Sequence, residues 1–351
     1  MSPPANPEVR VYLFTYRRPD TLPRALESLL AQTYTNWVCE LHNDDPNDDS
    51  ARQLVKTIND PRIYYVHHER NLGALASFNL AFRIVPERFM SILEDDNWWE
   101  PDLLATLLHE MTRRPDVHIA WANMWLWRET DSKVWEQIGS IWPISMPQEA
   151  IEFVSPEPRQ VCGALHSNGA MLARISGRTM FASPKELPFF AIESVRERAY
   201  PGRLLLVTRP LANFAITVDS ARGESADENM QIHVLLAVTF LTYANVSGEF
   251  YRRMWKACRG SLGHRHRSLL VAAILAGRLG KVLKSARLGD LTLVIAWALR
   301  HPIRFSTLFH AQDRFPEVLA FLDAASSARV SEWENQTGAE RLLSTPSTHS
   351  Q

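Results

Sequence analysis

Residues 90–102 read MSILEDDNWWEPD, a short apolar run that ends in three consecutive carboxylates and leads into the start of a helix. Three acidic side chains at the end of a strand repel one another, so folding alone gives no reason to place them there. A divalent cation changes that balance, because Mg²⁺ and Mn²⁺ prefer carboxylate oxygen and bridge readily to a diphosphate. The alternative is a solvated acidic turn that caps the helix from Asp102.

The first 120 residues alternate between two hydrophobic periodicities. Short segments rich in β-branched and aromatic residues predict strands at residues 9–14, 37–41, 62–66, 89–93 and 117–121. Between them, apolar residues fall on one helical face from Leu22 to Leu30 and from Leu103 to Met111. This alternation predicts an α/β fold with a mostly parallel sheet covered on both faces. Further apolar runs at residues 169–173, 203–207 and 213–218 are expected to close the sheet.

Polar clusters follow three of the predicted strands: TYRR at residues 15–18, NDDPNDD at 43–49 and EDD at 94–96. Ligands of such sheets bind outside the carboxyl ends of the strands, so we expect the three clusters to share one edge. After the third strand, Gly73 begins a predicted helix whose N-terminal amides can face a phosphate.

The second half of the chain is less regular at first and then helical. Seven of the eleven tryptophans lie between Trp98 and Trp142, where they either fill a core or stack on sugar rings. Trp98 and Trp99 are our candidates for stacking, and the others for the core. From residue 229 onward the pattern predicts helices at residues 230–244, 249–258, 268–287, 291–301 and 316–325.

The overall composition excludes several protein classes. The 351 residues carry a formal net charge of −1, so no global imbalance indicates nucleic-acid binding. The three cysteines, Cys39, Cys162 and Cys258, show no metal-ligand spacing and are expected to be reduced thiols. Residues 1–7 lack the pattern of a signal peptide, and no apolar stretch approaches the roughly 20 residues of a bilayer span. We therefore expect a cytoplasmic protein.

Four ordered motifs, residues 9–34, 37–49, 71–73 and 92–104, closely resemble those of the inverting family 2 glycosyltransferases. The resemblance covers residues 8–220 and implies a GT-A fold, a Rossmann-like, mostly parallel mixed sheet. We accordingly expect a GT-A nucleotide-sugar-binding and catalytic domain over residues 1–220. A C-terminal helical region over 221–344 and a disordered tail over 345–351 would follow it.

The resemblance also implies roles for particular residues. The expected nucleotide-sugar-binding residues are Thr15, Tyr16, Arg18, Asp44, Asp45, Asn71, Gly73 and Asp95. Asp96 corresponds to the residue that holds a metal, Mg²⁺ or Mn²⁺, on the donor diphosphate. Two departures stand out: Arg17 replaces a common asparagine, and Leu93–Asp96 replaces the usual Asp-x-Asp-Asp.

Inversion needs a general base, which in this family is usually an aspartate C-terminal to the metal motif. The matching region here is FFAIESVR at residues 189–196, so Glu193 is our candidate. The alternative is a surface glutamate paired with Arg196. On the acceptor side we place Trp98 and His166, and the alternative for His166 is a hydrogen-bonded structural histidine. The loop over residues 219–227 would close over the donor and bring Arg222 to a phosphate, unless it is only a mobile linker.

The leading hypothesis is thus a metal-dependent enzyme that moves a sugar from a nucleotide diphosphate to an acceptor hydroxyl of a glycan, a lipid-linked molecule or a small molecule. A sugar-nucleotide nucleotidyltransferase would be expected to carry a glycine- and lysine-rich loop after the first strand, and residues 15–19 contain no glycine. A non-catalytic nucleotide-sugar-binding protein would be expected to lose the acids that this chain retains.

Residues 250–289 contain no acidic residue but ten lysines or arginines, interleaved with apolar residues such as Trp255, Leu269 and Ile274. We hypothesise that this segment docks at an anionic membrane surface or holds a phosphate-bearing acceptor. Such docking would place the protein peripherally at the inner face of the membrane. The alternative is a helical bundle whose charged face is simply solvated.

Overall fold

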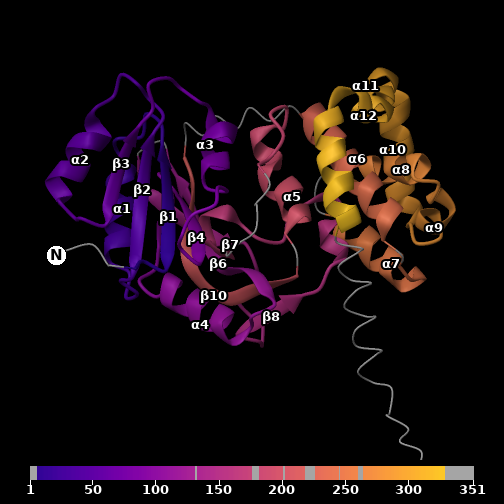
Figure 1. Cartoon of the computed structure of the whole chain (residues 1–351). Helices are drawn as coiled ribbons and strands as arrows, with labels where there is room; N and C mark the ends of the chain where they lie inside the picture. Colours follow the sequence, from indigo (N-terminus) through magenta and orange to yellow (C-terminus); the bar gives the residue numbers. More distant parts are fainter. Residues whose placement is uncertain are drawn as a thin grey trace, which may run out of the picture. The chain divides into compact units, whose positions relative to one another are not determined.

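The computed structural model describes residues 6–130, 133–175, 182–200, 202–217, 226–244, 246–259 and 264–328 (Figure 1). Contacts divide the chain into two units. The first comprises residues 1–155, 165–193 and 202–223, and the second comprises 156–164, 194–201 and 224–351. This division differs from a single cut at residue 220, because two short segments of the predicted first domain pack with the C-terminal helices.

One mixed sheet organises the first unit. Among the described residues its strands are β1 (Val9–Thr15), β2 (Trp37–Asn43), β3 (Ile63–His67), β4 (Phe89–Glu94), β5 (Trp98–Trp99), β6 (Val117–Glu129), β7 (Trp135–Ser140), β8 (Ala150–Phe153), β9 (Met171–Arg174) and β10 (Arg203–Ile216). Their order is β3-β2-β1-β4-β9-β6-β10-β5, with β7 on β6 and β8 on β10. Strands β3, β2, β1 and β4 are mutually parallel, as are β6 and β10, and the remaining pairings are antiparallel. The predicted α/β class with a mostly parallel mixed sheet is confirmed.

Strand β1 lies in the middle of the parallel part and is covered on both faces, which explains its almost continuous apolar sequence. On one face Val11 and Leu13 join the core formed with α1 (Leu22–Leu30) and α4 (Leu103–Arg113). On the opposite face Phe14 stacks on Phe78 of α3 (Ala74–Leu80), with ring centroids 5.1 Å apart. The short helix α2 (Ser50–Ile58) connects β2 to β3. Helix α5 (Ile192–Arg196) begins in this unit, and its residues from Ser194 onward belong to the second unit.

The two apolar runs predicted at residues 203–207 and 213–218 form one strand, β10. Its register against β6 shifts on both sides of Pro210. Proline has no amide hydrogen to donate to the ladder, so the strand accommodates it with a bulge rather than ending there.

The described part of the second unit is helical. Its helices are α6 (Ala226–Tyr243), α7 (Gly248–Ala257), α8 (His264–Leu275), α9 (Leu279–Leu283), α10 (Leu288–Arg300), α11 (Pro302–Thr307), α12 (Ala311–Arg314) and a last helix over residues 316–328. The single helix predicted over 268–287 is wrong. It breaks at Gly277, whose φ of +65° and the bond from the Arg278 amide to the Ala273 carbonyl form a glycine C-cap.

All three cysteines are free and buried. Cys162, in the turn Pro158–Cys162, lies against Cys258 at the end of α7, although the two are distant in sequence. The hydrogen bond between the two thiols, followed by burial, raises the pKa of Cys258 well above its usual value. None of the described helices combines the length and the apolar composition that a bilayer span requires.

Candidate functional site

The three polar clusters predicted from the sequence meet at one edge of the sheet. Strands β2 and β4 flank β1 in parallel, with Thr15 opposite Asn43 and Phe14 opposite Glu94. The carboxyl ends of all three strands therefore lie at the same edge, and the expected convergence of residues 15–18, 43–49 and 94–96 is confirmed.

Asp95 is held against the turn that follows β1. Its Oδ2 accepts a hydrogen bond of 3.2 Å from the Tyr16 amide. Burial and then the negative charge of Asp96 raise the pKa of Asp95 to about 7, although hydrogen bonds from Thr15 and Tyr16 act in the opposite direction. The structure thus brings the carboxylates of Asp95 and Asp96 together and disfavours ionisation of Asp95.

This pair of carboxylates fits a divalent cation that binds together with its substrate. The described residues contain no group of three or more His, Cys, Asp or Glu side chains arranged to hold a metal ion. Mg²⁺ is usually bound by one or two carboxylates, with phosphate oxygens and water as its other ligands. Asp96, with Asp95 beside it, supplies such a partial ligand set. A cation bound there would offset the repulsion from Asp96 that, together with burial, raises the pKa of Asp95.

Arg17, one of the two departures from the family pattern, covers Asp45. It adopts a φ of +56°, donates from Nε to Asp45 Oδ2 at 2.7 Å, and lies over the Tyr16 ring. The Asn47 amide donates to the other carboxylate oxygen at 3.0 Å. The hydrogen bond from Arg17 is the main cause that lowers the pKa of Asp45. The ionised form of Asp45 is therefore favoured, and each carboxylate oxygen keeps a second lone pair for a further hydrogen-bond donor.

Asp44 holds the loop that precedes α3. Its two oxygens accept hydrogen bonds from the Leu72 and Gly73 amides, at 2.8 and 2.9 Å, and Oδ1 also pairs with His68 Nδ1 at 2.8 Å. The expectation that amides at Gly73 face a phosphate is not met by these two, because they point at Asp44. The bonds fix the loop in which Gly73 adopts a φ of +82° and Asn71 is exposed.

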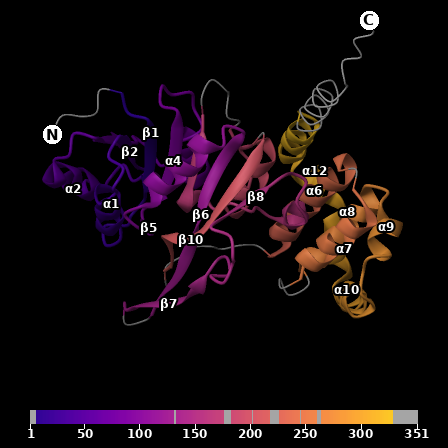
Figure 2. The ribbon, with the colours of Figure 1, turned by 90° about the horizontal axis from the view of Figure 1, so that it is seen from below.

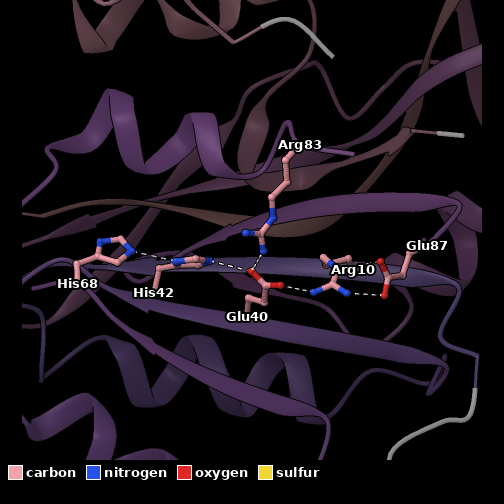
Figure 3. A network of polar contacts seen from close by, with 6 residues as sticks. All are labelled: Arg10, Glu40, His42, His68, Arg83 and Glu87. Carbon is pink, nitrogen blue, oxygen red and sulfur yellow. Dashed lines mark hydrogen bonds and ion pairs between the residues drawn. The ribbon is translucent and has the colours of Figure 1, made fainter. Parts of the chain in front are cut away.

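A largely buried polar chain continues from Asp44 along one face of β1 and β2, and Figure 3 draws it from His68 onward. His68 Nε2 lies 3.0 Å from His42 Nδ1, and His42 Nε2 lies 3.1 Å from Glu40 Oε2. Glu40 also binds Arg10 and Arg83. Arg10 in turn forms two hydrogen bonds to Glu87, at 2.8 and 2.6 Å.

The chain has a definite proton requirement. His68 Nδ1 donates to Asp44 and His42 Nε2 donates to Glu40, so in two neutral imidazoles the facing nitrogens, His68 Nε2 and His42 Nδ1, would both lack a proton. A hydrogen bond between these two nitrogens therefore requires one additional proton on either of them. Burial is the main cause that lowers the pKa of His42. Burial also acts against ionisation of Glu40, but the bond from His42 and the neighbouring arginine charges outweigh it and lower the pKa of Glu40.

Sequence reasoning missed this network. The available signal was the pair Glu40 and His42, two ionisable residues at alternate positions of an apolar strand that is buried along its whole length.

Replacing Asp44 with alanine should destabilise the first unit by about 3 kcal/mol, because two loop amides and a buried histidine lose their acceptor together. Urea unfolding measures this change. Asp49→Ala is the matched control, since that carboxylate is 65% exposed and its ion pair with Arg52 spans 3.5 Å. Equal stabilities of the two variants would show that Asp44 does not hold the loop.

The tryptophans near the acidic motif have different environments. Trp98 is half-buried, and the Arg24 guanidinium lies 3.8 Å from the centre of its ring and 4.5 Å from that of Trp135. Arg24 also donates to the Asp96 carbonyl at 2.7 Å, so it connects the aromatic pair to the acidic motif at residues 94–96. Trp99 is not available for stacking, contrary to expectation: it is 3% exposed and its Nε1 donates to the Gly169 carbonyl.

Glu193 is connected to the acidic motif through the turn at residues 167–169. Glu193 Oε1 accepts hydrogen bonds from the Asn168 amide at 2.7 Å and from Ser167 Oγ at 3.4 Å. A Cβ at Gly169 would lie only 3.0 Å from Asn97 Nδ2 and 3.1 Å from Glu94 Oε2, so the turn packs closely on the motif.

The remaining predicted residues complete this picture. His166 is 3% exposed beside the same turn. Arg18 donates to Thr217 Oγ1 at 3.3 Å. Arg222 and most of the loop over 219–227 lie outside the described residues, as does the tail over 345–351.

Comparison with known proteins identifies the class. Residues 11–149 match the family described as glycosyl transferase family 2, so this part of the chain is a family 2 glycosyltransferase domain. The fold resembles residues 1–349 of S. aureus TarS in complex with UDP-GlcNAc, with a TM-score of 0.56, 11% identity and coverage of 92% of each chain. The GT-A fold expected from the sequence is confirmed.

Curated relatives match over the same region. The putative colanic acid biosynthesis glycosyl transferase WcaA of Escherichia coli (strain K12) is 34% identical over 104 residues, which are 29% of this chain and 37% of that protein. WfaP of Escherichia coli, a UDP-Glc:alpha-D-GlcNAc-diphosphoundecaprenol beta-1,3-glucosyltransferase, is 26% identical over 118 residues, 34% of this chain and 46% of that protein. The chain thus aligns with less than half the length of these relatives.

Proposed function

We propose that the protein is a metal-dependent, inverting glycosyltransferase that transfers a sugar from a nucleotide diphosphate to an acceptor hydroxyl. The observation that carries the proposal is the Asp95–Asp96 pair, placed at the edge of the sheet where the ends of β1 and β2 also lie. The names of the relatives favour a glycan or a lipid-linked acceptor.

On the donor side, Thr15, Tyr16 and Asp45 would contact the nucleoside, and Asp44 would act indirectly by positioning the loop over residues 71–73. Asp96 would hold Mg²⁺ or Mn²⁺ on the diphosphate, where a bound cation stabilises the charge that develops on the leaving group. Arg24, through its bond to the Asp96 carbonyl and its stacking on Trp98, would keep this turn in place.

On the acceptor side, Glu193 would take the hydroxyl proton as the general base. Both of its described hydrogen bonds use Oε1, which fixes the carboxylate relative to the turn at residues 167–169. We assign Oε2 to the acceptor.

The proposal is tested by a thermal-shift screen of nucleoside-diphosphate sugars with and without Mn²⁺, because a ligand that binds only the folded state raises its melting temperature. A donor that stabilises the protein more with Mn²⁺ than without it, and is then consumed with release of the nucleoside diphosphate, supports the assignment. Binding without any turnover across a panel of acceptors would favour a nucleotide-sugar-binding protein, and consumption of nucleoside triphosphate would favour a nucleotidyltransferase.

Glu193→Gln should lower kcat by about 10² or more while the affinity for the donor stays unchanged, because glutamine keeps the Oε1 acceptor but cannot take a proton. Steady-state kinetics together with donor titration measure both quantities. Ser167→Ala is the control: it removes only the weaker bond to Oε1 and should cost less than tenfold. Loss of donor affinity at unchanged kcat would assign Glu193 a structural role.

A further inference from the structure

Helix α10 presents apolar side chains to the outside of the helical unit. Of its residues only Val294 is buried, whereas Leu288, Leu293, Ile295 and Leu299 are 58–81% exposed. Ile303 at the start of α11 is 79% exposed. Figure 2 shows α10 at the periphery of this unit. A helix normally turns its apolar side chains toward the core, so a group of exposed apolar side chains on the outside indicates an interaction surface.

Basic residues precede and follow α10 in the sequence. Lys281, Lys284 and Arg287 precede α10 and Arg300 ends it, and all four are exposed. The structure gives none of the four an ion pair with a described residue. The only acidic residue between positions 250 and 312 is Asp290, which already accepts hydrogen bonds from Trp255 and Arg259.

These positions correct the sequence-based hypothesis about residues 250–289. Two of the apolar residues that were to meet the membrane, Trp255 and Leu269, are 1% and 0% exposed and belong to the core of the helical unit. Ile274, Leu275 and Leu283 are 38–46% exposed, and the most exposed apolar side chains begin at Leu288. The basic residues at 281–287 therefore flank an apolar surface that lies C-terminal to them.

We propose that α10 and the start of α11 lie on an anionic lipid bilayer. The apolar side chains enter the boundary between headgroups and acyl chains, and the flanking basic residues bind lipid phosphates. A second copy packed symmetrically on this surface would bring the basic residues of both copies together. The one carboxylate of α10, Asp290, is already paired with Arg259, so charge complementarity favours a bilayer. The proposal does not depend on the chemistry of the first unit.

Flotation of the whole protein with vesicles of phosphatidylcholine alone, or with about one third phosphatidylglycerol, tests this proposal. We expect binding to the anionic vesicles only. This binding should weaken with salt, because salt shortens the Debye length over which the surface charges attract each other. Replacing Lys281, Lys284 and Arg287 with glutamine should lower the partition coefficient by about 10², since each basic residue contributes about fivefold.

The double variant Leu293→Glu, Leu299→Glu should abolish binding at every salt concentration. Ile84→Glu is the matched control, because Ile84 is 70% exposed but lies in the first unit, and binding should be unchanged. Circular dichroism melting confirms that each variant is folded. The proposal is overturned if the wild type fails to float with anionic vesicles at low ionic strength. It is also overturned if light scattering shows a dimer that the double variant dissociates, since a second copy would then occupy the surface.

Discussion

Asp96→Ala is expected to lower sugar transfer by at least about 10², because the variant would lose the proposed contact to a cation that would stabilise the leaving diphosphate, an effect of several kcal/mol. The fold should survive. Asp96 lies at a turn after β4, and Arg24 binds its backbone carbonyl, which the substitution leaves in place. The melting temperature without metal should stay the same or rise slightly, since a like charge beside Asp95 is removed.

The measurement combines turnover with the shift in melting temperature that Mn²⁺ causes in the presence of donor. Asp102→Ala is the control, because that nearby acid begins α4 without a side-chain capping bond. It should leave both quantities unchanged. If Asp96→Ala keeps near wild-type turnover in metal-containing buffer, the metal assignment is wrong.

Asp95→Asn is expected to stabilise the protein above pH 7 while it impairs transfer. The pKa of Asp95 is raised from 3.8 to about 7 in the folded state, so folding binds a proton between these values. The stabilising contribution of that proton is complete below the unfolded pKa and is lost as the pH rises through 7. Above that pH the buried carboxylate costs on the order of 4 kcal/mol, which the neutral amide does not.

Urea unfolding at pH 8 and pH 5, without metal, measures this effect. The gain of Asp95→Asn over wild type should be larger at pH 8 and should shrink as the pH falls toward 4. Asp45→Asn provides a comparison of opposite sign, since Arg17 lowers the pKa of Asp45 and its charge stabilises the folded state at pH 8. A gain that does not change with pH would show that Asp95 carries no such penalty.

The location of the site could be predicted from the sequence alone. Apolar strand segments, turn residues and helix starts are local signals, and parallel strands separated by helices must end at one edge. The sequence therefore predicted that Tyr16, Asp45 and Asp96 would approach one another, and Figure 1 shows β1, β2 and β4 side by side.

The state of each group at that site could not be predicted, because it depends on residues distant in sequence. The acids in both motifs look alike in the chain. Burial and Asp96 raise the pKa of Asp95, Arg17 lowers that of Asp45, and Asp44 is held by a loop and a histidine. Desolvation and Coulomb energies are set by three-dimensional neighbours rather than by sequence neighbours.

The solvent exposure of the apolar side chains of α10 could likewise be predicted only in part from the sequence. The sequence determined that α10 is an apolar helix, because its residues from Leu288 to Ala298 are mostly hydrophobic. Such a helix is ordinarily buried, and nothing in its own residues says otherwise. Only the packing of the other helices decided that Val294 faces the core while Leu293 and Leu299 do not. The side chains that bury an apolar face come from elsewhere in the chain, so tertiary structure alone determines whether that face remains open to a partner.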